Sequence, residues 1–282
     1  MTNTTKSPSF CYITPTSLLD FTTASKTHLV LAHLVDADEE YAAFYKTRSE
    51  AGDFIMCDNS AYELKEPYSP EKLVELGRKC GAHAIVLPDY PFQPAQVTIN
   101  AAQNFISVFK NAGFKTFFVP QSKRGDLEDW IRAYVWATNQ PDIDIIGFSI
   151  LGIPNALDKV DPSYARVVMT QILIDRGVFN KNKHHHYLGL NSGPALENPS
   201  LIRMGVIDTI DSSGPVWAAV MGHEYTRNAD SFQQTSKLKA PVQFNLPRPK
   251  DKATLERIKH NIALTQSLFE GDQTMQPWYA VE

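Results

Sequence analysis

Short apolar runs alternate with longer amphipathic segments along most of the chain. The amphipathic segments begin at helix-capping residues such as Ser69-Pro70 and Asp126, and one of them ends at Gly205. Strands that alternate with helices form a parallel sheet. The apolar runs that predict strands are residues 28–35, 54–57, 84–87, 116–119, 143–150, 187–190, 206–210 and, more weakly, 242–244.

Eight strand–helix units in one chain predict a closed (β/α)8 TIM barrel of the α/β class, as a single domain over residues 1–282. An open, doubly wound sheet is the structural alternative. A further apolar segment at residues 10–13 has no place in these eight units. Residues 215–240 are the least regular part of the chain, and we interpret them as a functional loop or a lid.

Composition and charge indicate in which compartment the protein works and which classes of partner it can have. The net charge of −4 gives no overall attraction for nucleic acid, so a polyanion would need a local basic patch. The three cysteines are widely spaced, which argues against a disulfide framework and fits a reducing cytoplasm. The polar residues 1–9 lack the apolar core of a signal peptide. Since no apolar run approaches the roughly 20 residues of a membrane span, we expect a cytoplasmic protein without a membrane partner.

Metal and cofactor sites are not expected. The same cysteine spacing supplies no thiolate cluster for zinc. The sequence His184-His185-His186 suggests a metal site, but consecutive residues of a strand point to opposite faces, so the three rings do not converge. We therefore predict no metal and no organic cofactor.

Polar side chains follow the predicted strands where active-site residues of such barrels lie. Asp58, Asp89, Gln121 and Asp211 each come at the end of an apolar run. Asp and Gln side chains can bind the edge of a purine, and displacement at a sugar C1′ needs a carboxylate nucleophile and an acid/base group. Each aspartate could instead cap a helix or a turn.

These residues stand in the order of a known family pattern. The segments are Asp58-Asn59-Ser60-Ala61-Tyr62, Asp89, Gln121, residues 147–152, Leu188-Gly189 and residues 207–211. In this series the chain resembles the tRNA-guanine transglycosylase superfamily, and more closely the phage-encoded DpdA enzymes, which put 7-deazaguanine derivatives into DNA.

The chain departs from that pattern at three points. The second glycine of the Gly-Gly segment is Phe148, which we expect to reshape the base pocket. The family's Ser-Gly-Gly reads Asn59-Ser60-Ala61. The Cys-x-Cys-x-x-Cys…His zinc site is absent from the sequence, so the zinc-binding subdomain is not expected and tRNA recognition is in doubt.

The resemblance implies a role for each matching residue. Asp211 would be the nucleophile and Asp58 the acid/base group. The residues expected to contact the base are Asp89, Gln121, Tyr62, Ser60, Gly147, Phe148, Leu188 and Gly189. Lys123 and Arg124, directly after Gln121 and Ser122, are the candidates for contact with nucleic-acid phosphates.

The function implied is a DNA guanine transglycosylase. It would exchange guanine for a 7-deazaguanine, with preQ0 as the expected base, through a covalent aspartyl–sugar intermediate. In a phage this modification protects DNA from restriction in the host cytoplasm. The DNA would be single-stranded, or a duplex with a flipped base.

Two alternatives remain open: exchange in RNA, and a non-catalytic nucleobase-binding barrel permitted by the departures at Phe148 and at residues 59–61. Retention of both Asp58 and Asp211 argues against the second, because binding needs no nucleophile. The oligomeric state is also open, with a homodimer as one option.

Overall fold

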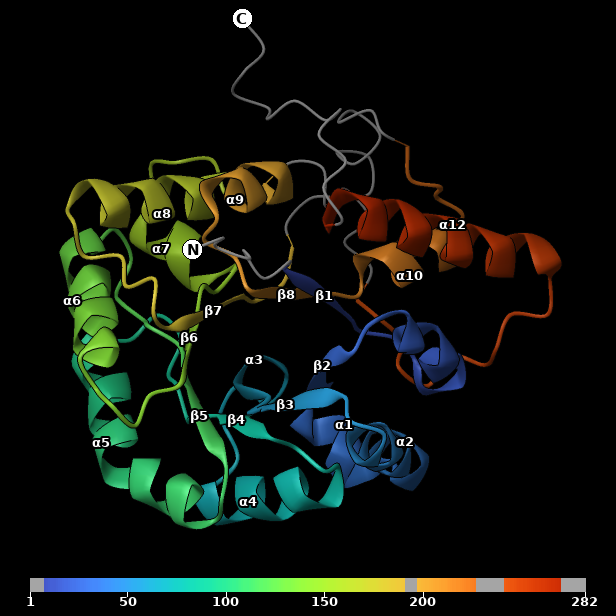
Figure 1. The fold of residues 1–282 in the computed structure, drawn as a ribbon, viewed down its shortest axis with the longest axis horizontal. Coiled ribbons are helices and arrows are strands. Elements are labelled where there is room, and N and C mark those ends of the chain that lie inside the picture. The colour runs from blue at the N-terminus through green and yellow to red at the C-terminus, as the bar shows by residue number, and fades with distance from the viewer. Residues whose placement is uncertain (1–7, 191–196, 227–240, 270–282) are drawn as a thin grey trace, which may run out of the picture.

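A ring of eight parallel strands forms the centre of the computed structural model, which describes residues 8–190, 197–226 and 241–269 (Figure 1). The strands are β1 (Ser9–Tyr12), β2 (Thr27–Leu31), β3 (Phe54–Asp58), β4 (Ala84–Val86), β5 (Lys115–Phe118), β6 (Ile145–Gly147), β7 (His184–Tyr187) and β8 (Thr209–Ser212). Hydrogen bonding runs in the order β1-β8-β7-β6-β5-β4-β3-β2, and β1 and β2 lie next to each other at the two ends of this order. The chain therefore folds as a nearly closed (β/α)8 barrel, and the predicted fold class is confirmed.

Helices surround the strands, and α3 lies over the middle of the ring in Figure 1. The helices are η1 (Thr16–Ala24), α1 (Ala32–Ala37), α2 (Glu39–Glu50), α3 (Ala61–Leu64), α4 (Pro70–Lys79), α5 (Ala95–Asn111), α6 (Leu127–Thr138), α7 (Gly152–Ala156), α8 (Ala165–Asp175), α9 (Asn198–Met204), α10 (Gly214–Val220) and α12 (Lys252–Phe269). Predicted caps are confirmed: the side chain of Ser69 accepts from the backbone N–H of Lys72, and that of Asp126 from Asp129.

The assignment of the eighth strand to residues 242–244 is wrong. That segment forms no strand, and the N-terminal segment that the sequence pattern left unplaced is β1, which pairs in parallel with β8. The physical reason is burial: Phe10, Cys11 and Tyr12 are all buried, whereas residues 241–244 are exposed or half-buried. An apolar run alone does not say which neighbour a strand pairs with.

Several predicted boundaries also shift. β7 begins at His184, three residues before the apolar run 187–190, and β8 extends to Ser212, two residues beyond the run 206–210. β2 ends at Leu31 because the rest of its apolar run forms α1. α8 begins at Ala165 rather than at the Asp161-Pro162 turn.

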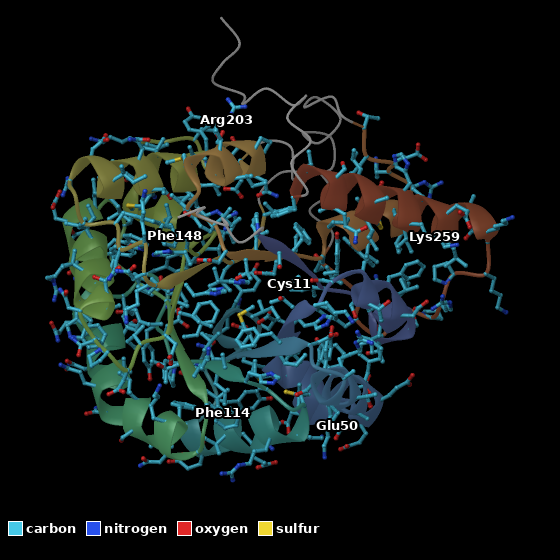
Figure 2. All side chains as sticks on the ribbon, in the orientation of Figure 1. Cys11, Glu50, Phe114, Phe148, Arg203 and Lys259 are labelled. Atoms are coloured by element: carbon cyan, nitrogen blue, oxygen red, sulfur yellow. The ribbon has the colours of Figure 1, made fainter. Side chains whose placement is uncertain are left out.

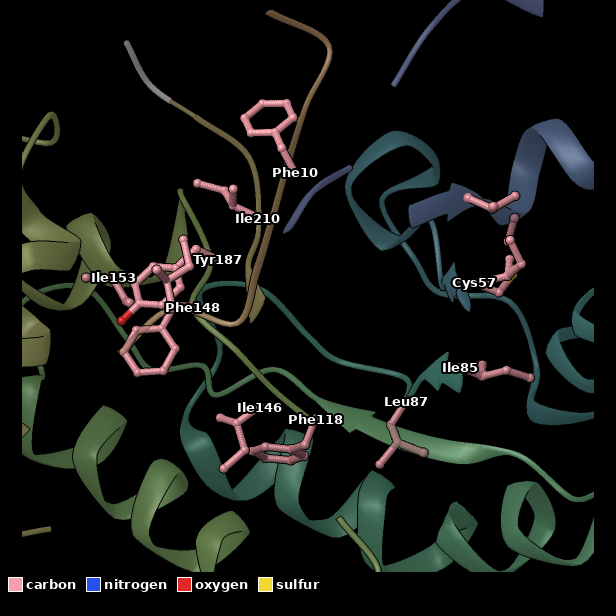
Figure 3. Packing of buried hydrophobic residues seen from close by; sticks show 14 of the residues in the cluster. Phe10, Cys57, Ile85, Leu87, Phe118, Ile146, Phe148, Ile153, Tyr187 and Ile210 are labelled. Atoms are coloured by element: carbon pink, nitrogen blue, oxygen red, sulfur yellow. The ribbon is translucent and has the colours of Figure 1, made fainter. Parts of the chain in front are cut away.

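Alternation of side chains along the strands separates two layers of core. In β3, Ile55 and Cys57 pack in the cluster that includes the surrounding helices, whereas Met56 packs inside the barrel. Figure 2 shows Cys11, another inside residue, at the middle of the ring. Figure 3 shows residues of the outer layer, including Phe148. The same alternation turns Asp58 inward at the end of β3.

The helices of the described residues include none with the length and hydropathy of a membrane span.

Candidate active site

A cavity of about 830 Å³ opens where the strands end. Apolar side chains from the strands line its inner part, among them Leu29, Val86 and Val119. Above them the cavity is lined by four carboxyl groups, those of Asp58, Glu63, Asp89 and Asp211. Among the described residues no Lys or Arg lines it. The structure thus brings together the three predicted aspartates and adds a fourth acidic residue.

Asp211 lies on β8 and is buried. Its Oδ1 accepts from the backbone N–H of Gly189 (2.9 Å) and lies 3.0 Å from Nε2 of His186. No described residue donates a hydrogen bond to its Oδ2. One oxygen of the carboxylate is therefore held by two N–H groups, and the other is available to a ligand.

The loop after β7 is fixed in a conformation that suits glycine. Gly189 has φ +73°, and a Cβ at this position would lie 3.0 Å from Cγ2 of Ile150. The buried Arg166 donates to the carbonyl oxygens of Leu188 (2.9 Å) and Gly189 (2.7 Å) and forms an ion pair with Glu197. These bonds hold the Gly189 N–H in place toward Asp211.

Among the described residues, the carboxyl group of Asp58 accepts one hydrogen bond, from the backbone N–H of Ser60 (3.0 Å). Burial raises the pKa of the Asp58 carboxyl well above its usual range, and the carboxyl groups of Glu63, Asp89 and Asp211 raise it further. Ser60 itself is in the left-handed conformation, at φ 56°. Such backbone strain in a non-glycine residue is common at functional sites. Asp58 therefore holds a proton to higher pH than an ordinary aspartate.

A second group of polar side chains surrounds Asp89. Nδ2 of Asn59 donates to Oδ1 of Asp89 (2.8 Å), and Nε2 of Gln121 donates to Oδ2 (2.6 Å). Burial raises the pKa of Asp89, and these two hydrogen bonds oppose the rise. Oδ1 of Asn59 accepts from the N–H of Ala61, so the same amide side chain also fixes the loop. The group is held as one unit.

Gln121 presents an unused acceptor. Its Oε1 is buried and has no hydrogen-bond partner among the described residues. A Cβ on Gly152 would lie only 2.9 Å from this oxygen, so the glycine gives the amide room in its present position. A buried acceptor without a partner is costly, which indicates that a ligand or water completes it.

Two lining residues were not found from the sequence. Glu63 lies on α3, and burial together with the charge of Asp211 raises its pKa. His33 follows β2, burial lowers its pKa, and its Nδ1 lies 3.0 Å from Oγ of Ser60. Glu63 could have been found from the sequence, because it comes directly after the segment from Asp58 to Tyr62 that was assigned to the site. His33 was hidden inside an apolar run.

The other predicted base-contacting residues separate into two groups. Tyr62, Leu188 and Gly189 line the cavity, with Tyr62 62% exposed. Ser60 is buried beside it. Gly147 and Phe148 do not line it.

The expectation that Phe148 reshapes the base pocket needs correction. Its ring is fully buried in the outer layer, stacked 4.6 Å from Tyr187 and edge-on to Trp130 (Figure 3). Gly147 precedes it with the opposite orientation, because a Cβ there would meet Phe117 and Val119. Strand alternation explains both placements.

The predicted phosphate-binding residues are outside the cavity. Lys123 and Arg124 are exposed in the loop after β5, and Arg124 pairs with Asp158 at 3.4 Å. Of the irregular region 215–240, residues 214–220 form α10 and residues 227–240 lie outside the described residues.

The described residues contain no cluster of three His, Cys, Asp or Glu side chains arranged to hold a metal ion. Within β7, His184 and His186 share the inner face and His185 packs outward against Tyr134 (3.0 Å between Nε2 and the hydroxyl).

No known family model matches the chain, and no curated protein matches it.

Proposed function

We propose that this chain is a DNA guanine transglycosylase, which exchanges guanine in DNA for a 7-deazaguanine base. The observation that carries the proposal is the contrast between two carboxyl groups in one cavity. Asp211 accepts two N–H groups on one oxygen, and the cavity-facing Asp58 has a raised pKa. Carboxyl groups whose surroundings separate their protonation suit a nucleophile paired with an acid.

In this mechanism Oδ2 of Asp211 attacks C1′ of the target nucleotide. The C1′–N9 bond breaks, and guanine leaves with the electron pair and takes a proton from Asp58. The incoming base then gives its N9 proton to Asp58 and attacks C1′, which displaces Asp211. Two displacements retain the configuration at C1′ and require no redox partner.

Recognition of the base is assigned to Asp89 and Gln121. A 7-deazaguanine presents N–H donors at N1 and N2, which need acceptors, and the buried Oε1 of Gln121 is an acceptor without a partner. Each carboxylate oxygen of Asp89 can accept a further hydrogen bond besides those from Asn59 and Gln121. The cavity volume of about 830 Å³ is in the range of small-molecule sites.

DNA is favoured over tRNA by the absence of the family's zinc motif from the sequence. The acidic lining would keep phosphates outside the cavity, and the exposed Lys123 and Arg124, in the loop after β5, are the candidates to contact them. The target base would enter as a single strand or by flipping from a duplex. The 7-substituent is proposed to be that of preQ0.

The deciding experiment incubates the protein with labelled preQ0 and either guanine-containing DNA or tRNA. Label entering DNA, together with a protein–DNA adduct on denaturing gels, is the expected result. Label entering only tRNA would assign the chain to RNA. Binding of preQ0 by calorimetry without label transfer to either polymer would identify a non-catalytic nucleobase-binding protein.

A further inference from the structure

A row of hydrogen-bonded polar side chains runs inside the barrel between β7 and β8 and ends at Asp211. Nε2 of His184 lies 2.8 Å from Oγ1 of Thr209, and the same oxygen lies 2.7 Å from Nδ1 of His186. Nε2 of His186 then lies 3.0 Å from Oδ1 of Asp211. His186 and Thr209 are buried, and they face each other in the register of the two strands.

The donor and acceptor properties of these groups determine the direction of each hydrogen bond in the row. An ionised Asp211 can only accept, so Nε2 of His186 must carry a hydrogen. In a neutral ring Nδ1 is then an acceptor, and the hydroxyl of Thr209 donates to it. That leaves the oxygen of Thr209 to accept from Nε2–H of His184. Each donor in this order meets an acceptor.

We propose that His186 is a positioning residue that binds Oδ1 of Asp211 and leaves Oδ2 as the attacking oxygen, with Thr209 and His184 fixing its ring tautomer. The catalytic consequence rests on the proposed function of Asp211, whereas the hydrogen-bond order does not. The backbone N–H of Gly189 is the second donor to the same oxygen. Together the two donors prevent rotation of the carboxylate.

The surroundings argue against a role in packing alone. Apolar side chains of the inner layer, such as Leu29, Val86 and Phe117, lie beside the row, and the ring of Phe117 lies edge-on to His186 at 5.4 Å. Bulky aliphatic residues fill such interiors at no polar cost. A polar row that runs through this layer and ends on the carboxylate at the cavity therefore has a use at the cavity.

Substitution at His186 tests the proposal through kinetics. His186→Gln keeps an N–H donor near the position of Nε2, and His186→Leu removes it. We expect His186→Leu to lower kcat for base exchange by about 10- to 100-fold, the range for a hydrogen bond to a charged group, with KM for the base little changed. His186→Gln should recover most of kcat.

His185→Leu is the matched control, because His185 is buried in the same strand, has a ring partner in Tyr134 and faces away from the cavity. It should lower the melting temperature without the loss of kcat. Equal kcat in His186→Leu and His186→Gln, or a loss in both that follows the melting temperature, would overturn the proposal.

Nitrogen-15 NMR of the histidine rings tests the hydrogen-bond order without activity. We expect His186 as the neutral Nε2–H tautomer in the wild-type protein, and loss of that single tautomer in Thr209→Val, which keeps the shape but removes the hydroxyl. An imidazolium or an Nδ1–H tautomer at His186 would contradict the order. Absence of base exchange by the wild-type protein would reject the proposed function, while the NMR result would still decide the tautomer, so the two failures are distinguishable.

Discussion

The two ends of β3 carry the same residue type in opposite surroundings. Asp53, directly before the strand, is buried and meets two cations, Arg48 at 2.6 Å and Lys26 at 3.4 Å; Nε2 of His28 also lies 3.0 Å from it. Burial raises the pKa of Asp53, but the hydrogen bonds with His28 and Arg48 outweigh it and the pKa is lowered. Burial raises the pKa of Asp58, at the other end, and the carboxyl groups that it faces raise it further.

The two ends of β3 therefore have different roles: the N-terminal end stabilises the fold, and the C-terminal end carries the groups of the candidate site. At the N-terminal end of the barrel the charge of Asp53 is neutralised, which supports the fold. At the C-terminal end no described Lys or Arg lines the cavity beside the carboxyl groups, an arrangement that costs stability and is useful only if a ligand or a reaction takes advantage of it. The division matches the general use of the two faces of such barrels.

Removal of the proposed nucleophile, at the C-terminal end of the barrel, should give the largest effect. Asp211→Asn keeps an oxygen that accepts from Gly189 and His186, so the melting temperature should stay near that of the wild type. Base exchange should fall by at least about 10³-fold, and no protein–DNA adduct should form on denaturing gels. Exchange by Asp211→Asn at close to the wild-type rate would end the mechanism proposed above.

Asp53→Asn, at the N-terminal end of the barrel, should lower the stability of the fold and leave base exchange unaffected. The substitution leaves Arg48 without its anion and His28 without a charged hydrogen-bond partner, and loss of one partner of a buried ion pair costs about 3 kcal/mol. Urea denaturation should show this loss, while base exchange per folded molecule stays unchanged below the new midpoint. A variant as stable as the wild type would show that the cations at this end contribute little.

Asp89→Ala sharpens the comparison within the cavity. It removes the acceptor of two amide donors and a proposed contact to the base, so calorimetry should show 7-deazaguanine binding weakened by about 1–3 kcal/mol. His185→Leu is a suitable control for general loss of packing. An unchanged affinity would remove Asp89 from base recognition.

The pH dependence of stability should have opposite signs at the two ends. A raised folded pKa means that stability falls as pH rises above the unfolded value of about 3.9, so Asp58→Asn should become progressively more stable than the wild type from pH 4 toward neutrality. A lowered folded pKa gives stability that is present above that value and is lost in acid, so the cost of Asp53→Asn should vanish as pH falls. The free energy of unfolding of both variants and of the wild type should be measured across this pH range. If the stability of Asp58→Asn and of Asp53→Asn relative to the wild type changed in the same direction with pH, the comparison would be refuted.

The sequence was sufficient to predict those parts of the structure that a short local pattern determines. Capping residues located α4 and α6, and acidic residues after apolar runs located three of the four carboxyl groups of the cavity. For Phe148, the position along the strand determined where the side chain points. Its neighbour Gly147 faces inward, so Phe148 faces outward and packs in the outer layer.

The remaining parts depend on pairing between distant segments. β1 could not be recognised from its apolar residues, because its place is set by β8. The role of His186 follows from the register that puts it opposite Thr209, and the starting point of β7 at His184 was not visible in the hydrophobic pattern. His33 was hidden because its run appeared to be a longer strand.

The pairing of β1 with β8 has a consequence for how the protein is made. Cys11 is the register partner of Asp211, so a segment near the start of the chain finds its neighbour only after about 200 further residues have left the ribosome. Contacts of such long sequence separation are slow to form, because the entropy of closing the loop is lost before the contact stabilises anything. During synthesis β1 therefore stays without its hydrogen-bonded partner until β8 has been made, and the strand that carries Asp211 completes the ring when it pairs with β7 and β1.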